Sequence, residues 1–211
     1  KQFTATVRPR PMAAFIADTI CQENFTQFTD KTSIPQGSTV AWSWNFDDGN
    51  LSSSQNPKHL YVNAGTYNVT VIATSDKGCS DTATKAVTVY PKPTADYAAS
   101  IACEDKQVQF IDSTEVLTGS IVDYAWSFGN VSTSSQQNPI NVYKDTGSYN
   151  AVLIVTTDKA CKDTISRVLK VHPNPVAKFT VSNVCQSDSA AFINGSTLSA
   201  GSMNHSWSFG D

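Results

Sequence analysis

Two adjacent carboxylates, Asp47 and Asp48, precede Gly49 in a stretch predicted to be a turn. Carboxylate oxygens presented by a turn are hard ligands of the kind that Ca²⁺ prefers. A similar stretch recurs later in the chain, where the matching positions are Gly129 and Asn130 and carry no formal charge. A Ca²⁺ site is therefore only weakly supported, no other cofactor is expected, and a turn closed by side-chain hydrogen bonds is favoured.

The three histidines, His59, His172 and His205, offer little further chemistry. His59 is replaced by Asn141 at the matching position of the recurring stretch, and the other two lack partners at metal-ligand spacing. The chain also lacks a Gly-x-Ser-x-Gly elbow, a phosphate-binding glycine loop and a Cys–His nucleophile pattern. The sequence therefore predicts no catalytic residue, no metal centre and no enzyme activity.

Large and structurally special residues recur at a constant interval of about 82 residues, which indicates an internal repeat. The matched sets are Pro11, Pro93 and Pro175; Cys21, Cys103 and Cys185; Cys79 and Cys161; Trp44 and Trp126; and Tyr67 and Tyr149. Trp207 follows Trp126 one residue short of the interval. So many matches at one interval indicate a duplicated module.

The repeat predicts the domain organisation. One full module covers about residues 11–91, a second covers 93–173, and residues 175–211 are the N-terminal half of a further module. Residues 1–9 align with the ends of the two full modules and are expected to be the last strand of a preceding one. Arg10, Lys92 and Asn174 each stand between two prolines. Because proline fixes φ, these linkers are stiff, and modules stacked end to end are expected.

Short runs within each module alternate between apolar and polar residues. In the first module they cover about residues 13–17, 26–28, 40–46, 67–73 and 83–89, and turn residues separate them. Alternation with period 2 indicates strands with one buried face. Several such strands within about 80 residues predict an all-β antiparallel sandwich of the immunoglobulin-like type.

Three motifs in the first module carry a family resemblance. They are Trp44-Asn45-Phe46-Asp47-Asp48-Gly49, Asn56-Pro57-Lys58-His59-Leu60-Tyr61 and Gly65-Thr66-Tyr67-Asn68-Val69-Thr70-Val71, with counterparts at Trp126-Ser127-Phe128-Gly129-Asn130, Gly147-Ser148-Tyr149 and Trp207-Ser208-Phe209-Gly210-Asp211. Together they resemble the signature of polycystic-kidney-disease (PKD) domains over essentially the whole chain. The cysteine placement resembles PKD arrays of Bacteroidota surface proteins, including gliding-motility adhesins. The resemblance implies tandem sandwiches in which Trp44, Phe46, Tyr67, Trp126, Phe128, Tyr149 and Trp207 have structural roles.

Five cysteines leave two disulfide pairings open. Equal repeats suggest Cys21 with Cys79 and Cys103 with Cys161, each inside one module. An immunoglobulin-like path, however, places Cys21 and Cys79 at opposite ends of a module, farther apart than a disulfide allows. We therefore favour Cys21 with Cys161, between consecutive modules, in an oxidising compartment.

A triplet of Asp, then Ser or Thr, then Ala, Ile, Leu, Val, Met or Thr occurs five times, at the hydroxyl residues Thr19, Thr82, Ser113, Thr164 and Ser189. It resembles the O-glycan acceptor of exported Bacteroidota proteins. Thr82 and Thr164 are also equivalent by duplication, so a repeated strand start is the competing interpretation.

The composition limits the partners. Charged residues make up 16% and the net charge is −3, so the chain offers no basic face for nucleic acid. No apolar run is long enough for a membrane span. We expect a segment of an extracellular cell-surface filament or adhesin that supplies reach, stiffness and display, for gliding or surface attachment. Its expected partners are neighbouring repeats, with surface polysaccharide and other cell-surface proteins as candidates. The alternative is a carbohydrate- or protein-binding accessory module of a secreted hydrolase. Trp42 is the best candidate platform for it, but the alternation of Trp42 with Trp44 places both on one face and favours the core for Trp42.

Overall fold

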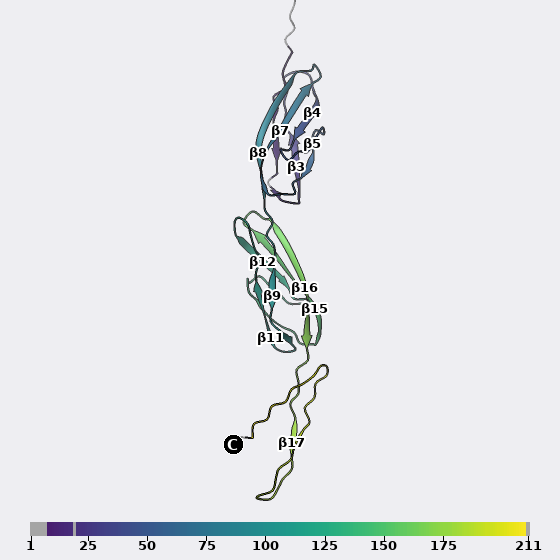
Figure 1. Ribbon diagram of the computed structural model, residues 1–211. Coiled ribbons are helices and arrows are strands. Elements are labelled where there is room, and N and C mark those ends of the chain that lie inside the picture. Colours follow the sequence, from purple (N-terminus) through teal and green to yellow (C-terminus); the bar gives the residue numbers. More distant parts are fainter. Residues whose placement is uncertain (1–7, 19, 210–211) are drawn as a thin grey trace, which may run out of the picture. The chain divides into compact units, whose positions relative to one another are not determined.

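The computed structural model describes residues 8–18 and 20–209 (Figure 1). The described residues form strands and loops, with no helix among them and so none that could cross a membrane. The strand expected over residues 1–9 falls largely on residues 1–7, outside the described residues. The all-β prediction is confirmed.

The first repeat is built from two sheets. The larger sheet has the order β2-β8-β7-β4-β5 and the smaller the order β1-β3-β6. Their bounds are β1 Phe15–Ala17, β2 Ile20–Cys21, β3 Phe25–Asp30, β4 Thr39–Asn45, β5 Leu51–Ser52, β6 Lys58–Leu60, β7 Gly65–Ser75 and β8 Ser80–Tyr90. β7 and β8 are the longest strands and pair along nearly their whole length.

The second repeat has the same two sheets, β10-β16-β15-β12-β13 and β14-β11-β9. Their bounds are β9 Tyr97–Ala99, β10 Ala102–Cys103, β11 Gln107–Asp112, β12 Ile121–Ser127, β13 Thr133–Ser134, β14 Ile140–Val142, β15 Gly147–Thr157 and β16 Lys162–His172. In the third repeat, β17 (Phe179–Val181) pairs with β18 (Phe192–Asn194), as β1 pairs with β3.

The first strand of each full repeat is divided between the two sheets. β1 is antiparallel to β3 in the smaller sheet, whereas β2 is parallel to β8 in the larger sheet and aligns Cys21 with Tyr90. The alternation over residues 13–17 predicts a single first strand, and that detail is wrong. The correction matters because the ladder fixes the cysteine beside the end of β8.

Aromatic residues fill the space between the sheets. Trp44 and Trp126 are almost fully buried, and each indole Nε1 donates to a loop carbonyl at 2.9 Å. Phe15 meets Trp44 edge-on with ring centroids 5.2 Å apart, and Tyr97 meets Trp126 in the same way at 5.0 Å. Such edge-to-face contacts add to the energy of apolar burial.

The tyrosines after Gly65 and Gly147 close the end of each sandwich. The Tyr67 hydroxyl donates to the Asn63 carbonyl at 2.8 Å, and the Tyr149 hydroxyl donates to the Asp145 carbonyl at 3.0 Å. Each bond reaches back a short way along the chain, as in a tyrosine corner.

The described chain divides into two compact units. The first continues through Thr94 and also takes in Val116–Val122 and Thr156–Asp163 from the second repeat. The second comprises Ala95–Glu115, Asp123–Val155 and the chain from Thr164 onward. The loop that carries Cys161 therefore belongs to the unit that contains the first repeat.

Candidate functional site

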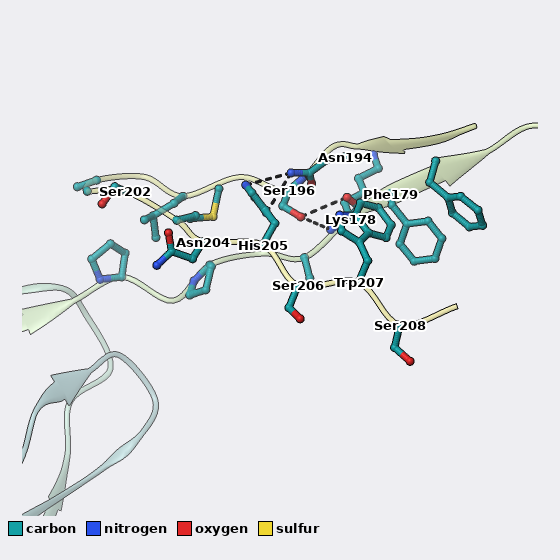
Figure 2. Close-up of a pocket in the computed structure, with 18 of the residues that line it drawn as sticks. Lys178, Phe179, Asn194, Ser196, Ser202, Asn204, His205, Ser206, Trp207 and Ser208 are labelled. Atoms are coloured by element: carbon teal, nitrogen blue, oxygen red, sulfur yellow. Dashed lines mark hydrogen bonds between the residues drawn. The ribbon is translucent and has the colours of Figure 1, made fainter. Parts of the chain in front are cut away.

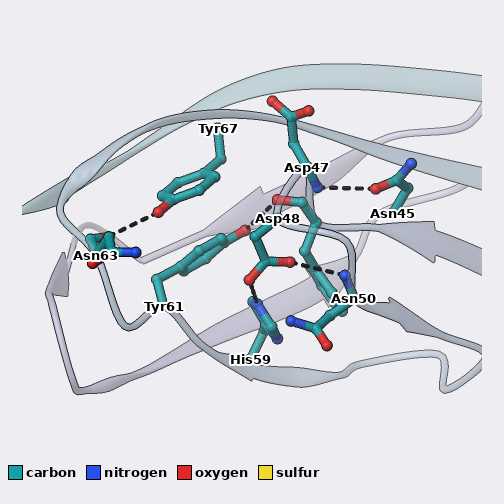
Figure 3. A network of polar contacts seen from close by, with 9 residues as sticks. Asn45, Asp47, Asp48, Asn50, His59, Tyr61, Asn63 and Tyr67 are labelled. Atoms are coloured by element: carbon teal, nitrogen blue, oxygen red, sulfur yellow. Dashed lines mark hydrogen bonds and ion pairs between the residues drawn. The ribbon is translucent and has the colours of Figure 1, made fainter.

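The carboxylates of the Asp47–Asp48 turn act as hydrogen-bond acceptors that close the turn. Figure 3 shows the contacts of the Asp48 carboxylate with Asn50 and His59. Asp47 has a φ of 66° and its N–H donates to Asn45 Oδ1 at 2.9 Å. The Asp47 carboxylate accepts from the Asn68 N–H at 2.8 Å, and the Asp48 carboxylate accepts from the Asn50 N–H at 3.1 Å. Both side chains therefore have a structural task.

His59 completes this network. Its Nε2 lies 2.6 Å from Asp48 Oδ2, and its ring stacks on Phe46 with centroids 4.2 Å apart and an interplanar angle of 1°. Burial by itself raises the pKa of Asp48, but hydrogen bonds from His59 and the Asn50 amide outweigh it and hold that pKa below its usual value. Burial, reinforced by the charge of Asp48, raises the pKa of Tyr61.

The corresponding turn of the second repeat forms without these charges. Gly129 has a φ of 77°, close to that of Asp47, and Asn130 Oδ1 accepts from the Ser132 N–H at 3.0 Å. A Cβ at Gly129 would lie 2.6 Å from the Asn150 nitrogen, so only glycine fits there. Among the described residues no three His, Cys, Asp or Glu side chains gather as a metal site would require.

A hollow of about 800 Å³ lies in the third repeat (Figure 2). Its wall includes Phe179, Phe192, Trp207 and Phe209, which correspond to the buried core aromatics of the first repeat. The Phe179 and Trp207 rings meet edge-on at 5.5 Å, as those of Phe15 and Trp44 do. Among the described residues this repeat has no counterpart of β7 or β8, so the hollow is the inner face of a half sandwich.

The joint is the set of residues that connects the first repeat to the loop before β16: Cys21, Glu23, Tyr90, Lys92, Lys159, Cys161 and Asp163. All of them belong to the first compact unit. Cys21 and Cys161 form a disulfide with Cα atoms 5.5 Å apart, although 140 residues separate them in sequence. Of the two pairings left open by the sequence, this is the one in the structure, and Cys79 and Cys103 are free thiols.

Charged and aromatic contacts surround the disulfide. Lys92, the residue between two linker prolines, places its Nζ 3.1 Å from Glu23 Oε2 and 3.9 Å from Asp163 Oδ1. Lys159 Nζ lies 5.8 Å from the centre of the Tyr90 ring. Exposed ion pairs and cation–π contacts stabilise by up to about 1 kcal/mol each, whereas a disulfide contributes about 2–4 kcal/mol. The disulfide is therefore the dominant connection of the joint.

The structure places four of the five candidate glycan acceptors outside the buried core. Thr82, Ser113, Thr164 and Ser189 are partly or fully exposed, whereas Thr19 lies outside the described residues. The Asp before three of them has a partner, and Asp163, before Thr164, is the one that lies 3.9 Å from Lys92 Nζ. Asp81 accepts from the Ala13 N–H at 2.8 Å, and Asp112 accepts from the Thr114 N–H at 3.0 Å.

Sequence reasoning missed a carboxylate that links the two sheets. Asp30, at the end of β3, accepts from Trp42 Nε1 at 2.9 Å and from Gln55 Nε2 at 3.2 Å. In the second repeat a hydrogen bond joins Asp112 to the Tyr124 hydroxyl. Trp42 therefore packs partly buried against the core with its N–H in use, and it is no free binding platform. The recurrence of an Asp and a ring donor at the repeat interval was the signal for this link.

Comparison with known proteins gives one family match and several relatives. The family described as "PKD domain" matches residues 7–89 and 90–171, more than half of the chain. The pre-pro-metalloprotease PrtV of Vibrio cholerae is 27% identical over 141 residues, which is 66% of this chain and 15% of the relative. Collagenase ColQ1 of Bacillus cereus is 46% identical over 48 residues, which is 23% of this chain and 5% of the relative. The chain thus spans a small part of the length of these relatives.

Solved structures include similar single domains. The PKD1 domain of the V. cholerae metalloprotease PrtV is 34% identical, with 38% of this chain and 96% of that chain covered and a TM-score of 0.36. The PKD1 domain of Vibrio anguillarum Epp is 30% identical, with 39% of this chain and 96% of that chain covered and a TM-score of 0.38.

Proposed function

This chain belongs to the PKD domain family, and from that membership we propose that it is a structural segment of an extracellular surface filament or adhesin. Its repeats supply reach, stiffness and display, and it performs no catalysis. The observation that carries the proposal is the Cys21–Cys161 disulfide, which connects consecutive repeats covalently. A cross-link of this kind persists in an oxidising environment, which supports a location outside the cell.

The principal partners in this proposal are the neighbouring repeats of the same chain. All three linker residues between prolines contact a repeat beside them: Arg10 pairs with Asp81, Lys92 pairs with Glu23, and Asn174 donates to Glu104. Stiff proline linkers and a disulfide both limit bending, as a filament that holds a surface at a distance requires. Surface polysaccharide and other cell-surface proteins are the contacts we propose for the ends of such a filament during attachment or gliding.

Small-angle X-ray scattering of the oxidised chain tests this proposal. A compact globule of 211 residues has a radius of gyration of about 17 Å, whereas sandwiches arranged end to end give about 25–30 Å. The proposal predicts the larger value, with an increase in flexibility for the Cys21→Ser/Cys161→Ser variant. A radius of gyration equal to that of the compact globule would contradict it.

The named relatives favour one second candidate, a binding module beside a hydrolase. A metalloprotease and a collagenase contain related PKD domains. A binding role requires exposed rings on the full repeats, and Phe25 is an exposed aromatic residue there whose counterpart is Gln107. Co-sedimentation with insoluble collagen separates the two functions. Binding that Phe25→Ala abolishes would favour the accessory role, and absence of binding favours the spacer.

A further inference from the structure

Cys103 has the same backbone surroundings as the paired Cys21. In the first repeat the N–H groups after the cysteine donate to the carbonyls of Tyr90 and Tyr61, at 2.8 and 2.9 Å. In the second repeat the counterparts donate to His172 and Tyr143, at 2.9 and 2.8 Å. Glu23 and Asp105, two residues after the respective cysteines, have φ of 64° and 56°. We call Cys21 and Cys103 the strand cysteines.

Cys79 likewise has the surroundings of the paired Cys161, and we call these two the turn cysteines. The Cys79 carbonyl accepts from the Ser75 N–H at 2.9 Å, and the Cys161 carbonyl accepts from the Thr157 N–H at 2.8 Å. The N–H of each cysteine donates to the hydroxyl of the same Ser or Thr at 3.1 Å. Cys161 is fully buried, whereas the free Cys79 is partly exposed.

The linkers beside the free cysteines make contacts like those of the joint. Near Cys103, Asn174 donates through its N–H to Glu104 Oε1 at 3.0 Å and through Nδ2 to the Glu104 carbonyl at 2.6 Å. Near Cys79, the Arg8 guanidinium donates to the Lys77 carbonyl at 2.9 Å. At the repeat interval Arg8 and Lys77 correspond to Tyr90 and Lys159, which contact each other in the joint. Cys79 and Cys103 therefore each lie in a formed half of a joint whose other half is a second repeat.

From this correspondence we propose that Cys103 and Cys79 are complementary half-joints with a fixed polarity. Cys103 accepts the turn cysteine of a PKD repeat that follows it on the same polypeptide, and Cys79 accepts the strand cysteine of one that precedes it. The same polypeptide is the source because the linker keeps the next repeat at high effective concentration. The inference rests on the proposed function, and it adds the rule by which repeats connect.

Closing each half-joint is a two-electron oxidation that uses a small-molecule disulfide such as oxidised glutathione. One thiol loses its proton, and its thiolate attacks the small disulfide and releases one small thiolate. The partner thiolate then attacks the mixed disulfide and releases the second. Two protein thiols and one small disulfide thus become one protein disulfide and two small thiols.

A tandem duplication of residues 93–174 within the full chain tests the rule, because it places a complete native repeat after Cys103. In the added copy, Cys103→Ser removes the second strand cysteine, so the protein keeps a single Cys103. Ala160→Gly in the same copy changes the mass of the peptide that contains its turn cysteine. Gly is the residue of the first repeat at this position, as Gly78. The protein is oxidised in a glutathione buffer, digested without reduction and mapped by mass spectrometry. The unduplicated chain is the control, in which Cys103 stays a free thiol.

The expected result is Cys103 linked to the marked turn cysteine and Cys21 linked to the unmarked one. A Cys103 that stays free, or that joins Cys185, Cys79 or another chain, while Cys21–Cys161 is present would overturn the pairing rule alone. Loss of Cys21–Cys161 in the unduplicated control would instead contradict the proposed function. A mixture of isotopically labelled and unlabelled protein identifies links between chains.

Discussion

Asp48 Oδ2 and His59 Nε2 lie 2.6 Å apart in the first repeat, and the second repeat replaces this pair with two asparagines, Asn130 and Asn141. The His59 and Asp48 side chains are only 11% and 17% exposed. Two repeats with one backbone therefore differ in one largely covered contact between a carboxylate and an imidazole. This difference predicts that lowering the pH destabilises the two repeats by different amounts.

Asp48→Asn should destabilise the first repeat by about 1 kcal/mol at neutral pH. The pKa of Asp48 is lowered in the folded state, so the ionised carboxylate stabilises the fold above its unfolded pKa. This contribution is lost as the pH falls through the lowered folded pKa, and the native chain and the variant then converge. Amide hydrogen exchange, resolved by repeat, measures the stability of the first repeat in the native chain and in the variant. A difference that stays constant down to about pH 2 would contradict the assignment, and Asn130→Ser is the uncharged control.

Trp44→Ala should lower the stability of the first repeat by about 3–5 kcal/mol, because it opens a cavity between the sheets. Trp126→Ala should do the same in the second repeat. Urea unfolding measures the loss, and the exposed Leu51→Ala is the control, with an effect below about 0.5 kcal/mol. A loss below about 1 kcal/mol for either tryptophan would show that its ring carries little of the core.

Asp30 and Trp42 should show a coupling energy of about 1 kcal/mol in a double-mutant cycle with Asp30→Ala and Trp42→Phe. Trp42→Tyr reproduces the ring of the second repeat, Tyr124, and keeps a donor. We therefore expect it to retain more stability than Trp42→Phe. Additive losses in the cycle would mean that the inter-sheet bond contributes no stability.

O-linked sugar is predicted on the accessible triplet residues Thr82, Ser113, Thr164 and Ser189, and on Thr19. The measurement is the intact mass of protein from its native source before and after chemical deglycosylation, followed by peptide mapping. Replacement of each Asp by Asn tests dependence on the triplet. An unmodified mass would contradict the prediction. The recurrence of the triplet would then be explained by duplication and by the structural roles of Asp81 and Asp112.

The repeat pattern in the sequence was enough to predict the sandwich, because period-2 alternation and buried tryptophans report directly on strands and core. The division of the first strand could not be read in the same way. β2 is only two residues long, and its parallel pairing with β8 depends on a residue far along the chain, Tyr90 beside Cys21. So short a strand leaves no periodic signal.

Polar contacts at the site were predictable only in part. Asp47 and Asp48 were expected as turn acceptors, and they accept backbone N–H groups. The Asp48–His59 pair was not foreseen, because the ring is placed by stacking on Phe46, which requires the folded register of β4 and β6. The left-handed φ of Glu23 likewise gives no sequence signal, since glutamate rarely adopts it.

The covalent connection of consecutive repeats is tested most directly by non-reducing peptide mapping of the oxidised native chain. For this 211-residue chain we expect one peptide that contains Cys21 and Cys161, with Cys79 and Cys103 recovered as alkylated thiols. A peptide that joins Cys21 to Cys79 would place the disulfide inside one repeat and contradict the account.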